Sequence, residues 1–409
     1  MLTSGAQALL SAAAVRKAAE RMLDLALDGQ LEAWRVDLDR LPATADFVVD
    51  VMRERYPTLA IPFHARWRHF VCDGRDLGLD TLASRAWPNP DARARAAFDL
   101  AITSVLLDAG AGPGWIYRDK STGLSATRSE GLALASLRWF AAGGMSNDPG
   151  DPLRADASAL QRLAAADLNV AFQASELNPL AGADGRTQLL ARLGATVQAR
   201  PALFALEDSP RPGGLFDALK ARTIKGVLPA ADILELLLDG LGSMWQNRPT
   251  LDGVPLGDCW PHSALRGPAP EDHFVPLHKL SQWLAYSLIE PLETAGITVS
   301  QLDALTGLAE YRNGGLFVDL GVLVPRDATD PSRTHQVSEP FIVGWRSLTV
   351  ALIDRLAPLV RARLGVSTDA FPLAKLLEGG TWAAGRRIAR ERRSDGGPPF
   401  SIVSDGTVF

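Results

Sequence analysis

The chain has 409 residues, 47% of them hydrophobic and 22% charged, so it is long enough to bury a large core. Its net charge of −5 argues against nucleic acid as the main partner, because proteins that track phosphates usually carry a basic surplus. There is no run of 18 apolar residues, and the two cysteines provide no disulfide framework. These features predict a soluble, cytoplasmic protein that acts on a small molecule, without nucleic acid or membrane as a partner.

Helical periodicity dominates the chain. Apolar residues recur at a spacing of 3.6 in residues 5–28, 91–107, 129–142, 156–176, 185–197, 230–247, 277–293 and 346–364. Strand-like alternation is rare, and its best candidates are residues 315–325 and 399–409. We therefore expect an all-α fold, with one large helical domain over 1–409, at most a small β ribbon, and a subdomain seam near 145–155. Four loops are long enough to suggest binding: 57–90, 108–128, 248–276 and 307–340.

The stretch "IPFHARWRHF", residues 61–70, is the first candidate for ligand binding. On a strand, His64, Arg66 and Arg68 would share one face and form a cationic surface suited to phosphate or carboxylate. The alternative is a structural cluster in which these residues pair with the acids of the following "CDGRD".

Asp108 stands in "LLDAGAGPGW", at the end of the helix expected over 91–107. A carboxylate is disfavoured there by the helix dipole, and the glycines that follow allow the backbone to turn tightly or approach a ligand. Asp108 is thus a candidate catalytic acid, and nearby Trp115 a candidate for substrate binding. The alternative is a capped helix with a solvated aspartate.

A segment near residue 260 combines Cys259 with His262, His273 and His278, which are zinc-type ligands. Their spacing fits no closed zinc motif, so we expect no metal, with Trp260 and His262 lining a pocket or packing in the core. The sequence also has no dinucleotide, P-loop, nucleophile-elbow or HExxH motif, and we expect no cofactor.

The helix expected over 277–293 carries a polar stripe of Lys279, Gln282, Tyr286, Glu290 and Glu293. Such a stripe is usually solvated. Its mixed composition favours a role in lining a site, which makes Lys279 and Gln282 candidates for substrate binding.

The stretch "LTGLAEYRNGGLFVDLGVL", residues 305–323, places Glu310, Tyr311 and Arg312 before two glycines. If the backbone bends at the glycines, an acid, a phenol and a guanidinium converge on a polar ligand. The alternative is a hairpin turn in which Arg312 pairs with Glu310 or Asp319.

Six stretches together resemble the uracil catabolism protein 4 family. They are "IPFHARWRHF", "SVLLDAGAGPGWIYRDKSTG", "RSEGLALASL", "GDCWPH", "FVPLHKLSQWLAYSLIEPLE" and "LTGLAEYRNGGLFVDLGVL". The resemblance implies a place in pyrimidine degradation, in a route that converts uracil to its nucleotide, opens the ring and breaks down a urea-bearing ribosyl species.

The last stretch is also similar to the queuosine salvage N-glycosidases, which are helical, resemble DNA glycosylases in fold and cut a base from a ribonucleotide. Glu310 falls at their aspartate, whereas Tyr311 and Arg312 match. Two departures are the longer acid and the turn Asn313-Gly314-Gly315.

Together these resemblances imply a metal-independent hydrolase that cleaves the N-glycosidic bond of ribosylurea or its 5′-phosphate and releases urea. Glu310 would stabilise the cationic sugar, and Asp108 would be a second acid or an anchor. The candidate substrate-binding residues are His64, Arg66, Arg68, Trp115, Trp260, His262, Lys279, Gln282, Tyr311, Arg312 and Asp319. Alternatives are an amidohydrolase acting on the ureido group and a binding protein without catalysis. A homo-oligomer is compatible with the sequence.

Overall fold

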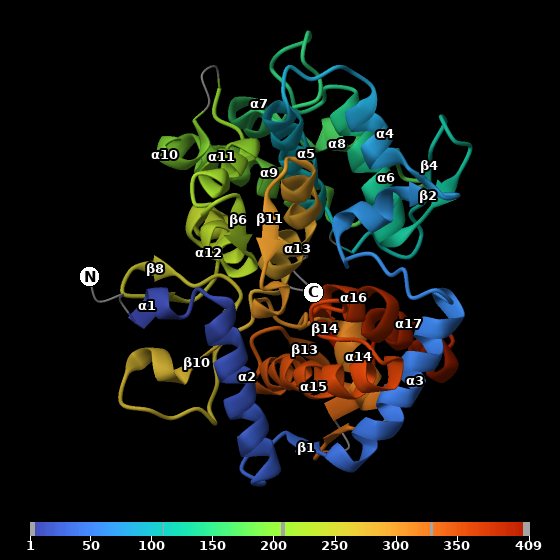
Figure 1. The fold of residues 1–409 in the computed structure, drawn as a ribbon, viewed down its shortest axis with the longest axis vertical. Helices are drawn as coiled ribbons and strands as arrows, with labels where there is room; N and C mark the ends of the chain where they lie inside the picture. Colours follow the sequence, from blue (N-terminus) through green and yellow to red (C-terminus); the bar gives the residue numbers. More distant parts are fainter. Residues whose placement is uncertain (1–4, 109, 206–208, 328–329, 404–409) are drawn as a thin grey trace. The chain divides into compact units, whose positions relative to one another are not determined.

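The computed structural model describes residues 5–108, 110–205, 209–327 and 330–403 (Figure 1). The chain forms two compact units, each built from separate stretches. The first unit contains Met1–His64, Asn247–Gln282 and Gln301–Phe409, and the second contains Ala65–Gln246 and Trp283–Ser300. The expected seam at 145–155 lies inside the second unit.

Helices form most of the first unit. Its α-helices are α1 (Gly5–Ala8), α2 (Ala12–Leu27), α3 (Leu41–Arg55), α14 (Tyr311–Asp319), α15 (Pro340–Leu364), α16 (Leu373–Lys375) and α17 (Trp382–Arg392). A π-helix, η8 (Leu376–Thr381), joins α16 to α17, and the 3₁₀ helices are η1 (Leu38–Arg40), η5 (Pro270–His273), η6 (Leu302–Ala304) and η7 (Asp330–Ser332). Helix α13 (Lys279–Thr294) belongs to this unit as far as Gln282.

Helix α15 is the central element of the first unit. It packs against α2, α3 and α14, and most of its side chains from Phe341 to Val360 are buried. Pro340 occupies its first turn, where a missing N–H costs nothing, and Gly365 ends it with a positive φ of 68°. Helices α2, α3 and α14 therefore pack around the apolar surface of α15 (Figure 1).

The second unit is also helical. Its α-helices are α4 (Leu77–Ala83), α5 (Pro90–Leu106), α6 (Arg128–Ala141), α7 (Ala157–Arg162), α8 (Ala165–Ala171), α9 (Ala183–Ala199), α10 (Pro201–Phe204), α11 (Leu215–Lys220), α12 (Ala230–Leu241) and the rest of α13. Its 3₁₀ helices are η2 (Arg66–Phe70), η3 (Pro212–Gly214) and η4 (Gly242–Met244).

Helix α5 forms the core of the second unit. Asn89 caps its first turn by accepting a hydrogen bond from the Ala92 N–H, and Pro90 follows at the first helical position. Every residue from Ala96 to Leu106 is buried, and the helix packs against α6, α9 and α11. Because this stretch is covered on all sides, even its polar residues Asp99, Thr103 and Ser104 lie in the core.

The strands of the described residues form seven separate two-stranded sheets. The expectation of at most one small ribbon is therefore wrong in the number of sheets, but each sheet is small. The hairpins are β2 (Val71–Cys72) with β3 (Arg75–Asp76), β4 (Tyr117–Arg118) with β5 (Ser125–Ala126), β7 (Thr250–Leu251) with β8 (Val254–Pro255), and β9 (Cys259–Pro261) with β10 (Phe274–Pro276). The longer-range pairs are β1 (Trp34–Val36) with β12 (Leu323–Pro325), β6 (Val227–Pro229) with β11 (Thr298–Ser300), and β13 (Thr334–Gln336) with β14 (Ser401–Val403).

The prediction of a mostly helical protein is confirmed, and several local expectations are corrected. The segment 156–176 divides into two helices, and 315–325 is helical up to Asp319 before it enters β12. Within 399–409 only Ser401–Val403 is a strand, and 404–409 lie outside the described residues. The four long loops contain short helices and strands of their own.

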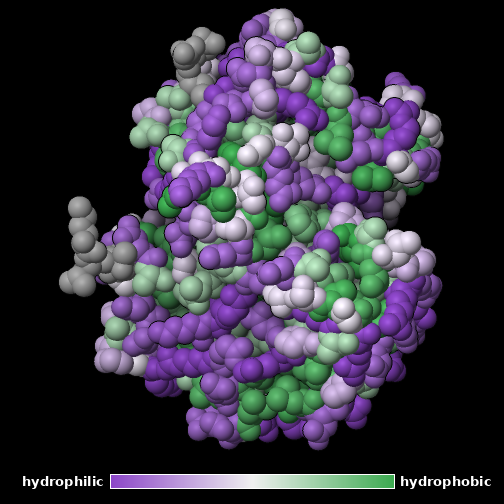
Figure 2. Space-filling view, viewed as in Figure 1, coloured by the Kyte–Doolittle hydropathy of each residue, from purple (hydrophilic) through white to green (hydrophobic). Residues whose placement is uncertain are grey.

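On the face shown in Figure 2, hydrophilic and hydrophobic residues are intermixed. Large exposed apolar side chains include Val170, Leu177 and Ile224, all of the second unit. Among the described helices, none is long and apolar enough to cross a membrane.

Candidate active site

Glu310 caps the first turn of α14. Its Oε2 accepts the Arg312 N–H at 2.8 Å and its Oε1 accepts the Asn313 N–H at 2.6 Å, and the residue is only 6% exposed. The carboxylate is thus fixed at the positive end of a helix dipole. Two of its roughly four lone-pair positions are used by these bonds.

The two glycines after Arg312 lie inside α14, so the expected bend at this point is wrong. A Cβ on Gly314 would stand 2.7 Å from the Trp345 ring and 2.8 Å from the Thr349 hydroxyl. Gly314 therefore allows α14 to pack closely on α15. The glycine pair predicted flexibility, whereas Gly314 serves close packing between helices.

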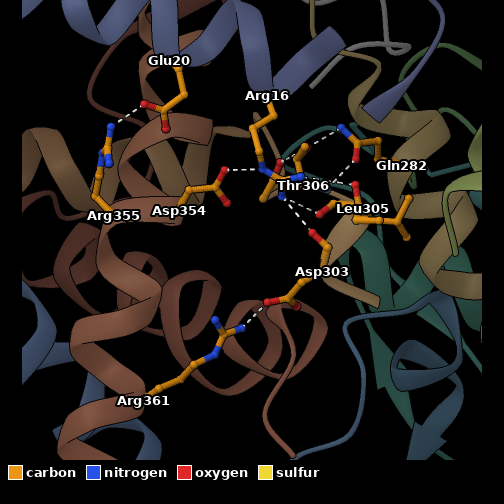
Figure 3. A network of polar contacts seen from close by, with 11 residues as sticks. Arg16, Glu20, Gln282, Asp303, Leu305, Thr306, Asp354, Arg355 and Arg361 are labelled. Carbon is orange, nitrogen blue, oxygen red and sulfur yellow. Dashed lines mark hydrogen bonds and ion pairs between the residues drawn. The ribbon is translucent and has the colours of Figure 1, made fainter. Parts of the chain in front are cut away.

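The segment before Glu310 is held by Arg16 of α2 (Figure 3). The Arg16 guanidinium donates to the carbonyls of Asp303 at 3.0 Å, Ala304 at 3.4 Å and Leu305 at 2.9 Å. It also pairs with Asp354 of α15 at 2.7 Å. One cation thus satisfies three carbonyls in a row and fixes the approach to α14.

Gln282 holds the next residue of this segment. Its amide donates to Thr306 Oγ1 at 2.6 Å and accepts the Thr306 N–H at 3.0 Å, and both residues are fully buried (Figure 3). Both ends of the Gln282 amide are therefore engaged inside the protein. Gln282 therefore positions the segment that precedes Glu310.

Asp258 and Arg346 form a buried ion pair on the other side of the same segment. Arg346 Nη1 and Nη2 donate to Asp258 Oδ1 and Oδ2, each at 2.7 Å. Asp258 also accepts the Trp260 indole N–H at 2.8 Å and the Lys279 backbone N–H at 3.1 Å. Burial alone would raise the pKa of Asp258, but Arg346 and these hydrogen bonds hold that pKa at about 2. Arg346 also donates to the carbonyl of Ala309, next to Glu310.

Arg312 and Asp319 are engaged with other partners, so the alternative in which Arg312 pairs with Glu310 or Asp319 is wrong. Arg312 lies over the Tyr311 ring at 4.7 Å and donates through Nη1 to the Gly396 carbonyl at 2.9 Å. Asp319 pairs with Arg393 through both of its oxygens.

His64 pairs with a residue that the sequence analysis did not select. Its Nδ1 lies 2.7 Å from Glu378 Oε2, both side chains are less than 10% exposed, and the Trp382 ring lies 5.6 Å away. Glu378 belongs to the π-helix η8, a local geometry that is often found at functional sites. The two residues are separated by 314 positions, so no local pattern indicates their contact.

The cationic face that a strand over 61–70 would give does not form, because Arg66–Phe70 form the 3₁₀ helix η2. Arg66 is fully buried in the second unit, where its Nε donates to Ser104 Oγ at 2.7 Å and its Nη1 lies 3.2 Å from Asp108 Oδ1. Burial lowers the pKa of Arg66, and the charge of Asp108 opposes that shift. Arg68 instead pairs with Glu290, not with the acids after Cys72.

Asp108 lies directly after α5 and faces more than one cation. Besides Arg66, the charge of Asp108 acts on Arg186, whose pKa is lowered by burial to about 10. Arg186 donates to the carbonyls of Leu107 at 3.1 Å and Gly110 at 3.0 Å. These arginines compensate the carboxylate at the negative end of the helix, and a solvated aspartate is excluded because the side chain is 8% exposed.

Two further aromatic candidates, Trp115 and His262, make structural contacts. Trp115 is fully buried and donates its indole N–H to the Phe172 carbonyl. His262 interacts with the Pro340 carbonyl through Nε2, and burial lowers its pKa. In the described part of the chain, no three His, Cys, Asp or Glu side chains are grouped so that they could hold a metal ion.

The candidates therefore divide between the two units. The first unit contains His64, Trp260, His262, Lys279, Gln282, Glu310, Tyr311, Arg312 and Asp319, and the second contains Arg66, Arg68, Asp108 and Trp115. Sequence reasoning missed Arg186, Asp258, Arg346 and Glu378. Of these four, only Asp258 lies in one of the six stretches that carry the family resemblance, "GDCWPH".

The fold and these residues define a mainly helical protein whose buried acids are fixed by arginines and backbone N–H groups. The chain belongs to the family described as "Protein of unknown function (DUF1688)", whose model matches residues 8–409. It is 38% identical over 434 residues to Uracil catabolism protein 4 of Lachancea kluyveri, covering 98% of both chains. It is also 38% identical over 421 residues to Protein urg3 of Schizosaccharomyces pombe, covering 100% of both.

Proposed function

We propose that this chain acts in uracil catabolism as a hydrolase of an N-glycosidic bond, with ribosylurea or its 5′-phosphate as substrate and urea as product. The pathway is inferred from the relative named Uracil catabolism protein 4, which matches the chain over nearly its full length. The observation that carries the chemistry is the buried Glu310 carboxylate, fixed by two backbone N–H groups at the start of α14.

The bond to be broken joins C1′ of the ribose to a urea nitrogen. As it breaks, the electron pair goes to the nitrogen, which takes a proton and leaves as urea, and positive charge develops on C1′ and the ring oxygen. Water then adds its oxygen to C1′ and loses a proton. A fixed carboxylate lowers the energy of the cationic sugar, because it is already oriented when the charge develops.

The neighbours of Glu310 suit an anionic substrate. Arg312 uses one of its five N–H donors on the Gly396 carbonyl, and its guanidinium is stacked on Tyr311. In this proposal the remaining donors bind the 5′-phosphate. Replacing Arg312 with alanine should then weaken the binding of the phosphorylated substrate more than that of ribosylurea itself.

The test is to incubate the purified full chain with ribosylurea and with its 5′-phosphate and to identify the products by mass spectrometry. Urea together with ribose or ribose 5-phosphate supports the proposal. Ammonia and carbon dioxide without urea would assign the protein to amidohydrolase chemistry instead. Tight binding of intact substrate without turnover would make it a binding protein.

A further inference from the structure

A cavity of the first unit has four arginines in its wall. It has a volume of about 660 Å³ and lies where the C-terminal end of α14 meets β1, β12, the start of α3 and the end of α17. The charged residues in its wall are Asp319, Arg35, Arg40, Arg392 and Arg393. Its size suits a small molecule.

One of the four arginines is already neutralised. Arg393 binds both oxygens of Asp319, at 2.7 and 2.6 Å, and also donates to the Gly397 carbonyl at 2.8 Å. The hydrogen bond to Asp319 raises the pKa of Arg393. Asp319 supplies the single acidic side chain of the wall, so the other three guanidinium groups face the cavity without an opposing charge in it.

The charges of these three side chains are also poorly compensated by carboxylates outside the cavity wall. In the described part of the chain, no carboxylate lies within ion-pair distance of Arg35 or Arg392. Arg40 reaches Asp37 at 3.3 Å, but the Arg40 side chain is 60% exposed, and such pairs contribute little. Bringing like charges together is unfavourable, and a bound anion would offset that cost.

The backbone fixes two of the arginines in place. Arg35 pairs with Val324 in the β1–β12 sheet, and because side chains alternate along a strand, it points away from the buried Trp34. Arg40 lies against Gly321, whose φ is +76°. A Cβ there would stand 3.3 Å from Arg40 Cδ and Nε. Glycine at 321 thus permits both the turn and the close approach of Arg40.

We propose that this cavity binds a small soluble phosphate ester through Arg35, Arg40 and Arg392. Guanidinium groups match phosphate oxygens with paired, charge-assisted hydrogen bonds, and three surplus positive charges suit a dianion. The C-terminal pole of α14 opposes an anion, but it amounts to about half a unit charge against three whole charges.

This site is separate from Glu310 and does not depend on the proposed hydrolase activity. Glu310 caps the first turn of α14, whereas Asp319 ends the helix. Nine helical residues span about 13 Å, which places the two carboxylates at opposite ends of one element.

The test is calorimetric titration of the full chain at low salt with glycerol 3-phosphate, with inorganic phosphate and with glycerol as the neutral control. Both phosphates should bind and glycerol should not. Arg35→Gln and Arg392→Gln should each weaken binding about tenfold, and Arg390→Gln, which changes the same charge on α17 outside the cavity, should leave it within about twofold. Thermal melts establish that each variant is folded.

Two results would overturn the proposal. Phosphate binding that is equal in wild type, Arg35→Gln and Arg392→Gln would place the anion elsewhere. If the chain sediments with phosphatidic acid vesicles but binds neither soluble phosphate, the cavity serves a membrane headgroup and not a soluble ester.

Discussion

Glu310 has a structural role that is independent of any chemistry, because it caps α14. Glutamate is not among the preferred residues at this position, whereas aspartate is. Its longer side chain still reaches the N–H groups of Arg312 and Asn313. A substitution that only removes the cap is therefore distinguishable from one that moves the carboxylate.

We predict that Glu310→Asp keeps the cap and the melting temperature but loses at least about tenfold in turnover, since the carboxylate withdraws by one methylene. Glu310→Gln keeps one oxygen acceptor and should lose about a hundredfold in turnover with substrate binding nearly unchanged. Single-turnover rates measured beside thermal melts separate the two effects. If both variants lose stability in parallel while turnover per folded molecule stays normal, Glu310 is only a cap.

Asp108 shows how a contact across the fold reverses a local expectation. Its place after a helix C-terminus predicts that Asp108→Asn is neutral or slightly stabilising. The structure pairs Asp108 with the fully buried Arg66, so the substitution leaves a buried cation undercompensated.

We therefore predict that Asp108→Asn lowers the free energy of unfolding by about 3 kcal/mol. Asp91→Asn is the matched control, because Asp91 on the same helix forms an ion pair with the half-exposed Lys220 and should cost less than about 1 kcal/mol. Urea denaturation of the two variants provides the comparison. Equal, small losses would mean that the Arg66–Asp108 pair contributes nothing to stability.

At the scale of elements, periodicity identified most of the long helices, since α5, α6, α9, α13 and α15 lie within or close to predicted segments. It missed α3 and α17, which lie outside every predicted segment. It failed where packing decided the conformation. Gly314 and Gly315 read as a turn because isolated glycines disfavour helix, yet α14 forms because its glycine face fits against Trp345. The cationic face considered for residues 61–70 does not form, because Arg66 is bound by Ser104 and Asp108 and Arg68 is bound by Glu290.

The ion pair between Asp258 and Arg346 connects α15 to the start of α13 and to the segment before α14. Its loss should therefore lower the stability of the first unit. Asp258→Asn is predicted to lower the free energy of unfolding by about 3 kcal/mol, because Arg346 stays buried without its charge partner. Glu20→Gln, which breaks an exposed pair with Arg355 in the same unit, should cost under about 1 kcal/mol. A loss at Asp258 no larger than at Glu20 would contradict the importance given to this pair.

For the whole molecule, the sequence predicted the helical class and the stretches that contain the candidate residues, but not their partners. Arg16 with Asp354 and His64 with Glu378 are more than 300 residues apart, so only the tertiary fold brings them together. Gln282 and Trp115, which were predicted to bind substrate, instead form hydrogen bonds with backbone groups of the protein. A polar residue beside an apolar helix face has the same pattern whether it binds a ligand or a carbonyl.

The buried carboxyl group of Asp99 should make the free energy of unfolding depend on pH. Burial raises the pKa of Asp99 in α5 to about 6, against the charge of Arg211 and hydrogen bonds from Gly213 and Ala155. Because the folded pKa lies above the unfolded value, the stabilisation is full below about pH 4 and is lost as pH rises through 6. Relative to Asp99→Asn, wild type should lose on the order of 3 kcal/mol between pH 4 and 7 in urea denaturation. A constant difference would contradict the shift.

In the function proposed above, the chain breaks a bond between ribose C1′ and nitrogen by adding water at carbon. The most direct test is turnover of ribosylurea in water labelled with oxygen-18, with mass spectrometry of both products. The proposal predicts one labelled oxygen in the ribose, unlabelled urea, and loss of this labelling with Glu310→Gln. Ammonia and labelled carbon dioxide without any urea, the ribose leaving first as ribosylamine, would show attack at the ureido carbonyl and would contradict it.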